Sequence, residues 1–309
     1  MGTLVIQTPY SEVTATLELL DRWGVTRNGL KDFRKATSRI HREVALLIQG
    51  GEVVSVSPPP FMSSPFFADE ERESDYGYPP GFAVRSIPEQ LLKLAPHFPN
   101  LDPEPALHLS RSLPDLSFIP EVWMGREVRR WVNWYAVPRW ERGVSSSGGE
   151  AVEKVLEMLA STRFVYNPYK GAFGPEHLRI TERTVVALRM LSASQKGDYL
   201  LIPAQFGFSH RGRSARRVRV VYAPHEFGLG SFITGCMLLS HPERLVEEAD
   251  LHICCPGEEY HNLETNGGSS LHAPFFRFFG GKVWFEVRFC GDADDHYSSA
   301  SAFFPPKLV

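Results

Sequence analysis

The residues with the most evident chemistry form an arginine-rich stretch in the second half of the chain. Between Phe208 and Tyr222 the sequence reads FSHRGRSARRVRVVY, and no acidic residue interrupts its five arginines, Arg211, Arg213, Arg216, Arg217 and Arg219. A guanidinium group donates hydrogen bonds in a planar fork that matches a phosphate or a carboxylate. The stretch therefore predicts contact with an anion, which belongs either to a phosphate-bearing partner or to the chain itself.

Two local structures would present these arginines differently. A helix would carry an apolar stripe with the arginines fanning outward, whereas a strand would place valines and arginines on opposite sides. Because GFSHRG reads as a loop after an apolar strand, a strand–loop–helix order is favoured. Such a loop can hold a phosphate through Arg211 and Arg213, although the GxxxxGK[ST] spacing of a Walker loop is absent.

Internal neutralisation is the alternative reading of the arginine stretch. The candidate carboxylates near the C-terminus are Glu243, Glu247, Glu248 and the cluster from Asp292 to Asp295. A second acidic run, from Asp69 to Asp75, lies in a proline- and serine-rich segment and could cover a basic face elsewhere in the molecule.

A second basic region lies near the N-terminus. The stretch LELLDRWGVTRNGLKDFRKA resembles a helix-turn-helix, with Gly24 at the turn. This resemblance implies that the recognition helix begins with the residues that would reach base edges or phosphates, Thr26, Arg27, Asn28 and Lys31. Leu20 replaces the small residue that lets such helices approach, and Gly29 weakens the second helix. A plain helical hairpin with a solvated basic face is the alternative.

Tryptophan and arginine alternate in a third stretch, WMGREVRRWVNWYAVPRWER, which holds four of the six tryptophans. Stacking aromatic rings beside arginine is how single-stranded nucleic acid is bound without sequence preference. The same composition suits a protein-binding surface or the edge of a core. The helical spacing of Trp131, Trp134 and Tyr135 favours packing toward the interior.

Possible catalytic groups gather in HICCPGEEYH, namely His252, Cys254, Cys255, Glu258, Glu259 and His261. In a strand, His252 and Cys254 face one side and Cys255 the other, so these side chains cannot converge on a metal without a bulge. Cys254 or Cys255 could serve as a nucleophile, but nothing nearby in the sequence lowers a thiol pKa recognisably.

The remaining metal-like motifs are incomplete. His225 and Glu226 begin like a zincin helix, but Leu229 occupies the position of the second histidine. Asp292, Asp294 and Asp295 could hold a hard cation, but the later glutamate of an EF-hand is missing and a solvated acidic turn is favoured. The sequence therefore predicts no metal and no cofactor.

The composition of the chain indicates which class of protein carries these motifs. The chain has 309 residues, of which 43% are apolar and 22% charged, and its net charge of -3 argues against nonspecific DNA binding over the whole surface. No secretory signal and no membrane-spanning apolar run are evident. None of the four cysteines forms a CxxC motif, so we expect a reduced, cytoplasmic protein without a membrane partner.

The order of the elements indicates an α+β fold, with a helical N-terminal segment followed by a mixed or antiparallel sheet with helices. We expect a helical hairpin over 1–57, a proline-rich acidic linker over 58–86, a proline- and tryptophan-rich middle over 87–142 and an α+β domain over 150–309. In the last segment EAVEKVLEMLAS and ERTVVALRMLSA predict helices, and DYLLIPAQF and DLHICCPG predict strands. PFFRFFGGKVWFEVRFCG predicts a hairpin whose second strand buries Val283, Phe285, Val287 and Phe289.

Residues 197–260 carry a family resemblance through GDYLLIPAQFGFSHRGRS, EFGLGSFITGCMLLSHPERL and DLHICCPGEEY. Together with the hairpin and YSSASAFF, these stretches resemble an uncharacterised family of bacterial, mobile-element-like proteins with no assigned activity. The resemblance implies a bacterial or mobile-element origin and transfers no catalytic residue.

These observations favour a non-enzymatic protein that engages nucleic acid or a nucleoprotein through Arg211–Arg219, assisted by the basic helix after Thr26. A hydrolase or transferase with a site between PAQFG and HICCPGEEYH is the first alternative. An inhibitor or adaptor that binds another protein through the tryptophan-rich middle is the second.

Overall fold

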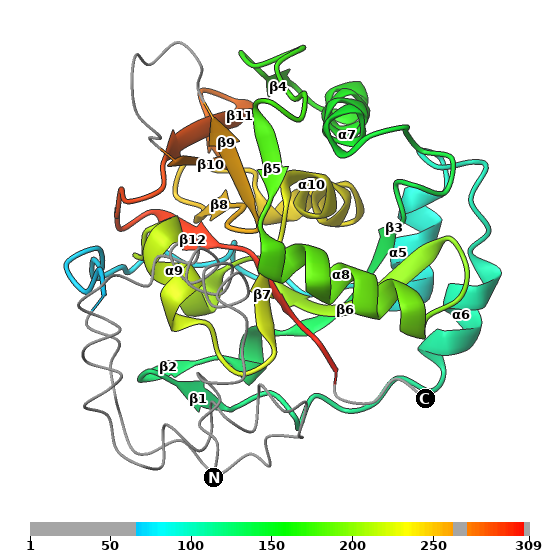
Figure 1. The fold of residues 1–309 in the computed structure, drawn as a ribbon, viewed down its shortest axis with the longest axis horizontal. Coiled ribbons are helices and arrows are strands. Elements are labelled where there is room, and N and C mark those ends of the chain that lie inside the picture. The colour runs from blue at the N-terminus through cyan, green and yellow to red at the C-terminus, as the bar shows by residue number, and fades with distance from the viewer. Residues whose placement is uncertain (1–65, 262–270, 306–309) are drawn as a thin grey trace, which may run out of the picture. The chain divides into compact units, whose positions relative to one another are not determined.

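The computed structural model describes residues 66–261 and 271–305, and these residues adopt an α+β fold (Figure 1). The described helices are α5 (Ile87–Leu94), α6 (Glu104–Ser110), α7 (Gly148–Thr162), α8 (Glu182–Ser194), α9 (Ala215–Val221) and α10 (Ser231–Ser240), with 3-10 turns η1 (Arg129–Trp131), η2 (Phe208–His210) and η3 (Pro242–Arg244). The N-terminal helical hairpin that the sequence predicts, including Arg27, Asn28 and Lys31, lies outside the described residues.

One sheet has four strands in the order β3-β6-β13-β7 and is antiparallel throughout. Its strands are β3 (Asn133–Pro138), β6 (Tyr199–Gln205), β7 (Glu226–Gly228) and β13 (Ser301–Phe303). Every residue of β6 is buried, as the apolar run DYLLIPAQF predicts. Because β3 pairs with β6, segments 87–142 and 150–309 share one sheet and one core.

The second sheet is mixed and is built around a long hairpin. Its strands are β4 (Val165–Tyr166), β5 (Leu178–Ile180), β8 (His252–Cys254), β9 (Glu258–His261), β10 (Leu271–Phe279), β11 (Lys282–Phe289) and β12 (Tyr297–Ser299). A separate two-stranded ribbon consists of β1 (Val122–Trp123) and β2 (Arg126–Glu127).

The hairpin confirms the strongest local prediction from the sequence. Gly280 and Gly281 join β10 to β11 with φ values of 58° and 73°, a left-handed conformation that favours glycine. Along β11, Val283 and Phe285 are fully buried, but Phe289 is 40% exposed. The predicted buried face is therefore wrong at its last position, where the strand runs beyond the core.

Helix α10 lies in the interior, and all of its residues are buried. Figure 1 shows α7 and α8 on either side of it in this view. Gly235 permits the close approach of α7, since a Cβ at this position would lie 2.9 Å from both methyl groups of Val155. A helix that is buried on every side and mostly apolar is typical of the core of a protein, and α10 carries only Ser231, Thr234 and Ser240 as polar side chains.

The tryptophan-rich middle is not helical at Trp134 and Tyr135. These residues belong to β3, where Tyr135 is buried and Trp134 partly so. The sequence predicted that these side chains pack toward the interior, and this is confirmed for Tyr135. The local structure is a strand, because these residues pair with β6.

No helix in residues 66–261 and 271–305 combines the length and apolarity that crossing a bilayer demands.

Replacing Phe285 by alanine should lower the free energy of unfolding by about 3–5 kcal/mol, because the ring is fully buried and its loss leaves a cavity. The matched control on the same hairpin is Phe279→Ala, which should cost only about 1 kcal/mol because the side chain is 47% exposed. Urea denaturation followed by circular dichroism measures both values. Equal losses for the two variants would contradict this placement of the core.

Candidate anion-binding site

The arginine stretch adopts the favoured strand–loop–helix order, running from β6 through η2 to α9. Two glycines allow the loop to turn. Gly207 has φ 109° and Gly212 has φ 74°, and a side chain at Gly212 would collide with the carbonyl oxygen of Arg72. Ser214 then caps α9, because its hydroxyl accepts a hydrogen bond from the backbone amide of Arg217 at 2.9 Å.

The acidic segment near residue 70 crosses directly over this loop. The amide of Arg72 donates to the carbonyl of Gly212 at 2.7 Å, and the amide of Ser214 donates to the carbonyl of Glu70 at 3.2 Å. These backbone bonds form an isolated antiparallel bridge between Glu71 and Arg213. The bridge positions two consecutive carboxylates against the arginine stretch, as the sequence suggested for the run from Asp69 to Asp75.

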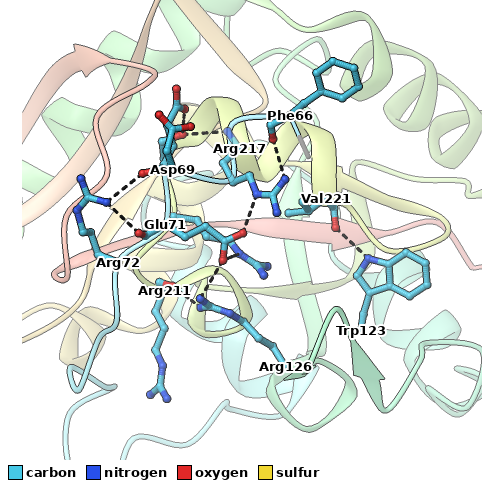
Figure 2. Close-up of polar contacts among 12 residues, drawn as sticks. Phe66, Asp69, Glu71, Arg72, Trp123, Arg126, Arg211, Arg217 and Val221 are labelled. Carbon is cyan, nitrogen blue, oxygen red and sulfur yellow. Dashed lines mark hydrogen bonds and ion pairs between the residues drawn. The ribbon is translucent and has the colours of Figure 1, made fainter. Parts of the chain in front are cut away.

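Glu71 is the centre of the cluster (Figure 2). One of its oxygens accepts from Arg217 Nε at 2.6 Å, while the other lies 3.0 Å from Arg213 Nε and 3.4 Å from Arg126 Nη2. Burial acts to raise the pKa of Glu71, but the bonds and charges of Arg217 and Arg213 outweigh it and lower the pKa. Glu71 therefore stays ionised and serves as the counterion of buried arginines.

Two further arginines of the stretch also have carboxylate partners. Arg216 pairs with Glu70, which also accepts a hydrogen bond from the Ser214 hydroxyl at 2.6 Å. Arg219 Nη1 lies 3.0 Å from a carboxylate oxygen of Glu259. The partners suggested near the C-terminus, from Glu243 to Glu248 and Asp292 to Asp295, are not the ones that the described structure places against these arginines.

The stretch is therefore not the open basic surface that the sequence suggested. Arg213 and Arg217 are each only 3% exposed and are held by Glu71. Buried guanidinium groups need such a counterion because an isolated charge in the interior is very unfavourable. Arg213, Arg216 and Arg217 thus fasten the acidic segment to α9.

Arg211 differs from the other four. Its side chain is half-buried and points away from Glu71, as Figure 2 shows, and within the described residues no carboxylate lies within ion-pair distance of it. Its guanidinium lies 4.6 Å from the centre of the Phe208 ring. Arg126 of β2 donates a hydrogen bond to the Arg211 carbonyl, so the two arginines belong to one local structure.

The pKa of Arg126 is affected by the positive charges of the neighbouring arginines. Its pKa is lowered to about 10, first by burial and then by the charges of Arg213, Arg211 and Arg217, which Glu71 only partly offsets. Five arginines meet here, namely Arg126, Arg211, Arg213, Arg216 and Arg217, and the two paired carboxylates among them are Glu70 and Glu71. These seven groups alone carry 5 − 2, or +3, and the three carboxylates that line the adjoining cleft, Glu73, Asp75 and Glu127, reduce the sum to 0.

A cleft of about 450 Å³ opens beside Arg126 and Arg211. Trp131 and Phe208 stack in its wall with ring centres 3.6 Å apart, and the buried Ser209 hydroxyl, which lines the cleft, has no hydrogen-bond partner. Three exposed acidic residues also line the cleft: Glu73, Asp75 and Glu127. The cleft thus combines guanidinium donors, a free hydroxyl and an aromatic wall, with an acidic rim.

Behind this cleft lies a buried polar network. His210 Nε2 lies 2.7 Å from Glu226 Oε1, which also accepts from the Ser301 hydroxyl at 2.6 Å. Burial acts to raise the pKa of Glu226, but the charge and hydrogen bond of His210 and the donors Ser301 and Ala223 lower it overall. The network ties η2 to β7 and β13 and so holds Ser209 and Arg211 in place.

The geometry does not support a nucleophilic thiol or a metal site among the cysteines and histidines of HICCPGEEYH. Burial raises the pKa of Cys254 to about 12 and also raises the pKa of Cys255, which opposes nucleophilic chemistry. His252, Cys254, Cys255 and His261 do not converge as metal ligands. Within the described residues, the one group of three such side chains whose ligand atoms lie within 4.8 Å of one another is Asp294, Asp295 and His296, in the acidic run that the sequence singled out.

Comparison of the chain with protein-family models, with curated proteins and with solved structures finds no match. The resemblance to bacterial, mobile-element-like proteins therefore stays a prediction, and the assignment of a function depends on the geometry alone.

Sequence reasoning missed Arg126 and left the role of Glu70 and Glu71 open. The acidic run and the interleaved arginines were the available signals, since opposite charges in separate segments often meet. Which carboxylate meets which arginine depends on chain crossings that no local pattern encodes.

Substituting Glu71 by glutamine should destabilise the fold by about 2–3 kcal/mol, less than the ~3–5 kcal/mol of a fully buried pair because the side chain is 24% exposed. Since folding lowers the pKa of Glu71 below 4.5, the stabilisation exists above that pH and is lost as the pH falls through the folded-state pKa. Urea unfolding at neutral and acid pH should therefore show a difference that shrinks in acid. Glu73→Gln, an exposed neighbour, is the control, and an equal loss there would contradict the role of Glu71.

The thiols offer a test of the catalytic alternative. All four cysteines are buried, so the native protein should react with Ellman's reagent far more slowly than the same protein in guanidinium chloride, which exposes four thiols. Rapid modification of Cys254 or Cys255 in the native state would revive the nucleophile hypothesis.

Proposed function

We propose that the protein is non-enzymatic and binds single-stranded nucleic acid, free or within a nucleoprotein, at the cleft beside Arg126 and Arg211. The observation that supports this is the meeting of two distant stretches at one cleft. Arg211 and Phe208 come from the arginine stretch, while Arg126 and Trp131 come from the tryptophan-rich stretch. Aromatic rings beside guanidinium groups are the common means of binding single strands without reading their sequence.

Charge is the second support. The pKa of Arg126 is lowered first by burial and then by the charges of Arg213, Arg211 and Arg217, so repulsion among these arginines acts at the wall of the cleft. A phosphate between Arg126 and Arg211 would relieve that repulsion and accept hydrogen bonds from both forks. The cleft volume of about 450 Å³ falls within the range typical of small-ligand sites.

The arginines of the stretch then have two different roles. Arg213, Arg216 and Arg217 hold the acidic segment, while Arg211, together with Arg126, faces the ligand. Arg27, Asn28 and Lys31 remain proposed as a second contact within the N-terminal segment, by their resemblance to a recognition helix.

The acidic rim restricts the partner. Glu73, Asp75 and Glu127 would repel a long polyanion lying flat on this face, so we expect only one or two phosphates to be engaged. Each phosphate contact to a single strand changes the slope of log K against log salt by about −0.7, so two contacts give about −1.4.

The experiment is fluorescence anisotropy with a labelled oligothymidylate and the full-length protein at several salt concentrations. Arg211→Ala should weaken binding about tenfold and reduce the salt slope by about 0.7, because one charged contact is removed. The control is Arg142→Ala, an exposed arginine beyond the opposite end of β3. A dissociation constant that is independent of salt, or equal for the two variants, would overturn the proposal.

A further inference from the structure

A second cavity, of about 440 Å³, lies among β3, α8 and α10, away from the arginine cluster. Its wall is mainly apolar and includes Val137, Trp140, Val185, Leu188, Phe232 and Ile233. Charged groups contribute as well, through Arg139, Glu141 and Arg189. A mostly apolar cavity with a few polar groups is typical of small-molecule sites.

A smaller space of about 30 Å³ adjoins this cavity and shares Trp140, Phe232 and Ile233 with it. Ile180 and Leu188 are also common to both spaces, and Gly148, Thr184, Gly230 and Glu258 complete the lining of the smaller one. Its volume exceeds the roughly 10–15 Å³ that one water needs, so it can hold a single small polar group.

The carboxylate of Glu258 lines this space, and only one of its two oxygens accepts hydrogen bonds from the described residues. The residue is 4% exposed, and its Oε2 accepts hydrogen bonds from the Ser231 amide at 2.8 Å and the Ser231 hydroxyl at 2.5 Å. A Cβ on Gly230 would lie 2.5 Å from Oε1, so the glycine keeps that oxygen accessible. Arg219 donates a hydrogen bond to the backbone carbonyl of Glu258 at 2.6 Å, but no arginine, lysine or histidine of the described residues lies within ion-pair distance of the Glu258 carboxylate.

Capping of α10 accounts for the position of Oε2 but not for that of Oε1. The bonds to Ser231 satisfy the first amide of the helix and use Oε2 alone. Burial raises the pKa of Glu258 despite these bonds, because the described structure provides no cation to compensate the charge. Oε1 beside an apolar cavity is suited to receive a positive donor from a ligand.

We infer that this cavity binds a small amphipathic amine, whose apolar body lies against Trp140, Leu188 and Phe232 and whose ammonium group pairs with Glu258. The ammonium supplies the missing counterion, and the apolar walls strengthen the ion pair by excluding water. Arg139 and Arg189 line the larger cavity but not the smaller space, so a carboxylate that enters the smaller space would meet repulsion from Glu258. An alcohol would form a hydrogen bond there without the charge contribution.

Isothermal titration of the full-length protein with benzylamine, phenethylamine and phenylbutylamine tests the inference, with phenylbutanol and phenylbutanoate as charge controls. At least one amine should bind, about tenfold or more tighter than both the alcohol and the carboxylate. Binding should tighten as the pH rises through the raised pKa of Glu258 and weaken again near the amine's own pKa of about 10.

Two variants separate the charge from the cavity. Glu258→Gln keeps an acceptor for Ser231 and should lose at least about tenfold in amine affinity, with little change for the alcohol. Leu188→Trp fills the cavity and should abolish binding of both, whereas Val186→Ala, an exposed site on the same helix, should change neither. Failure of all three amines to bind the wild type, or equal amine affinity for wild type and Glu258→Gln, would overturn the inference. Oligonucleotide binding at the other cleft should be unaffected, so the two proposals fail independently.

Discussion

The structure around the arginine stretch depends on one carboxylate. Glu71 contacts the guanidinium groups of Arg126, Arg213 and Arg217, which come from two further segments of the chain. Burying a cation is costly unless a counterion or hydrogen-bond acceptors accompany it, so the acidic segment over the loop stabilises the packing of α9. Three regions far apart in the sequence are thereby joined at a single ion cluster.

The arginines of this cluster outnumber its paired carboxylates, so some arginines have a carboxylate partner and Arg211 does not. Glu70 and Glu71 hold the buried arginines, whereas Arg211 lines the cleft with no carboxylate of the described residues within ion-pair distance. Phe208 and Trp131 lie at the same cleft because η2 and η1 flank the ends of β6 and β3, which are paired strands. The sheet pairing therefore unites aromatic and basic residues that belong to different stretches.

Glu258 and Glu71 show how surroundings set the behaviour of the same side chain. Arginine neighbours lower the pKa of Glu71. Glu258 is buried, and among the described residues only Ser231 donates to its carboxylate, so its pKa is raised. Glu71 is consequently a satisfied structural ion. Glu258 is a buried acid beside an open space, which is the arrangement expected where a protein leaves a charge for a ligand to complete.

Several helices and strands could be predicted from the sequence alone. The spacing of apolar residues predicted α7, α8, β6 and the hairpin of β10 and β11, because periods of 3.6 and 2 and a glycine pair at a turn are local properties. Only the tertiary structure decided that Trp134 lies in a strand, since pairing with β6 overrides the helical spacing. It also decided that Arg216 and Arg217 pair with Glu70 and Glu71, 146 residues away, rather than with acids nearer in sequence. Charge composition reveals that counterions are needed, but which ones meet depends on how the backbone crosses itself.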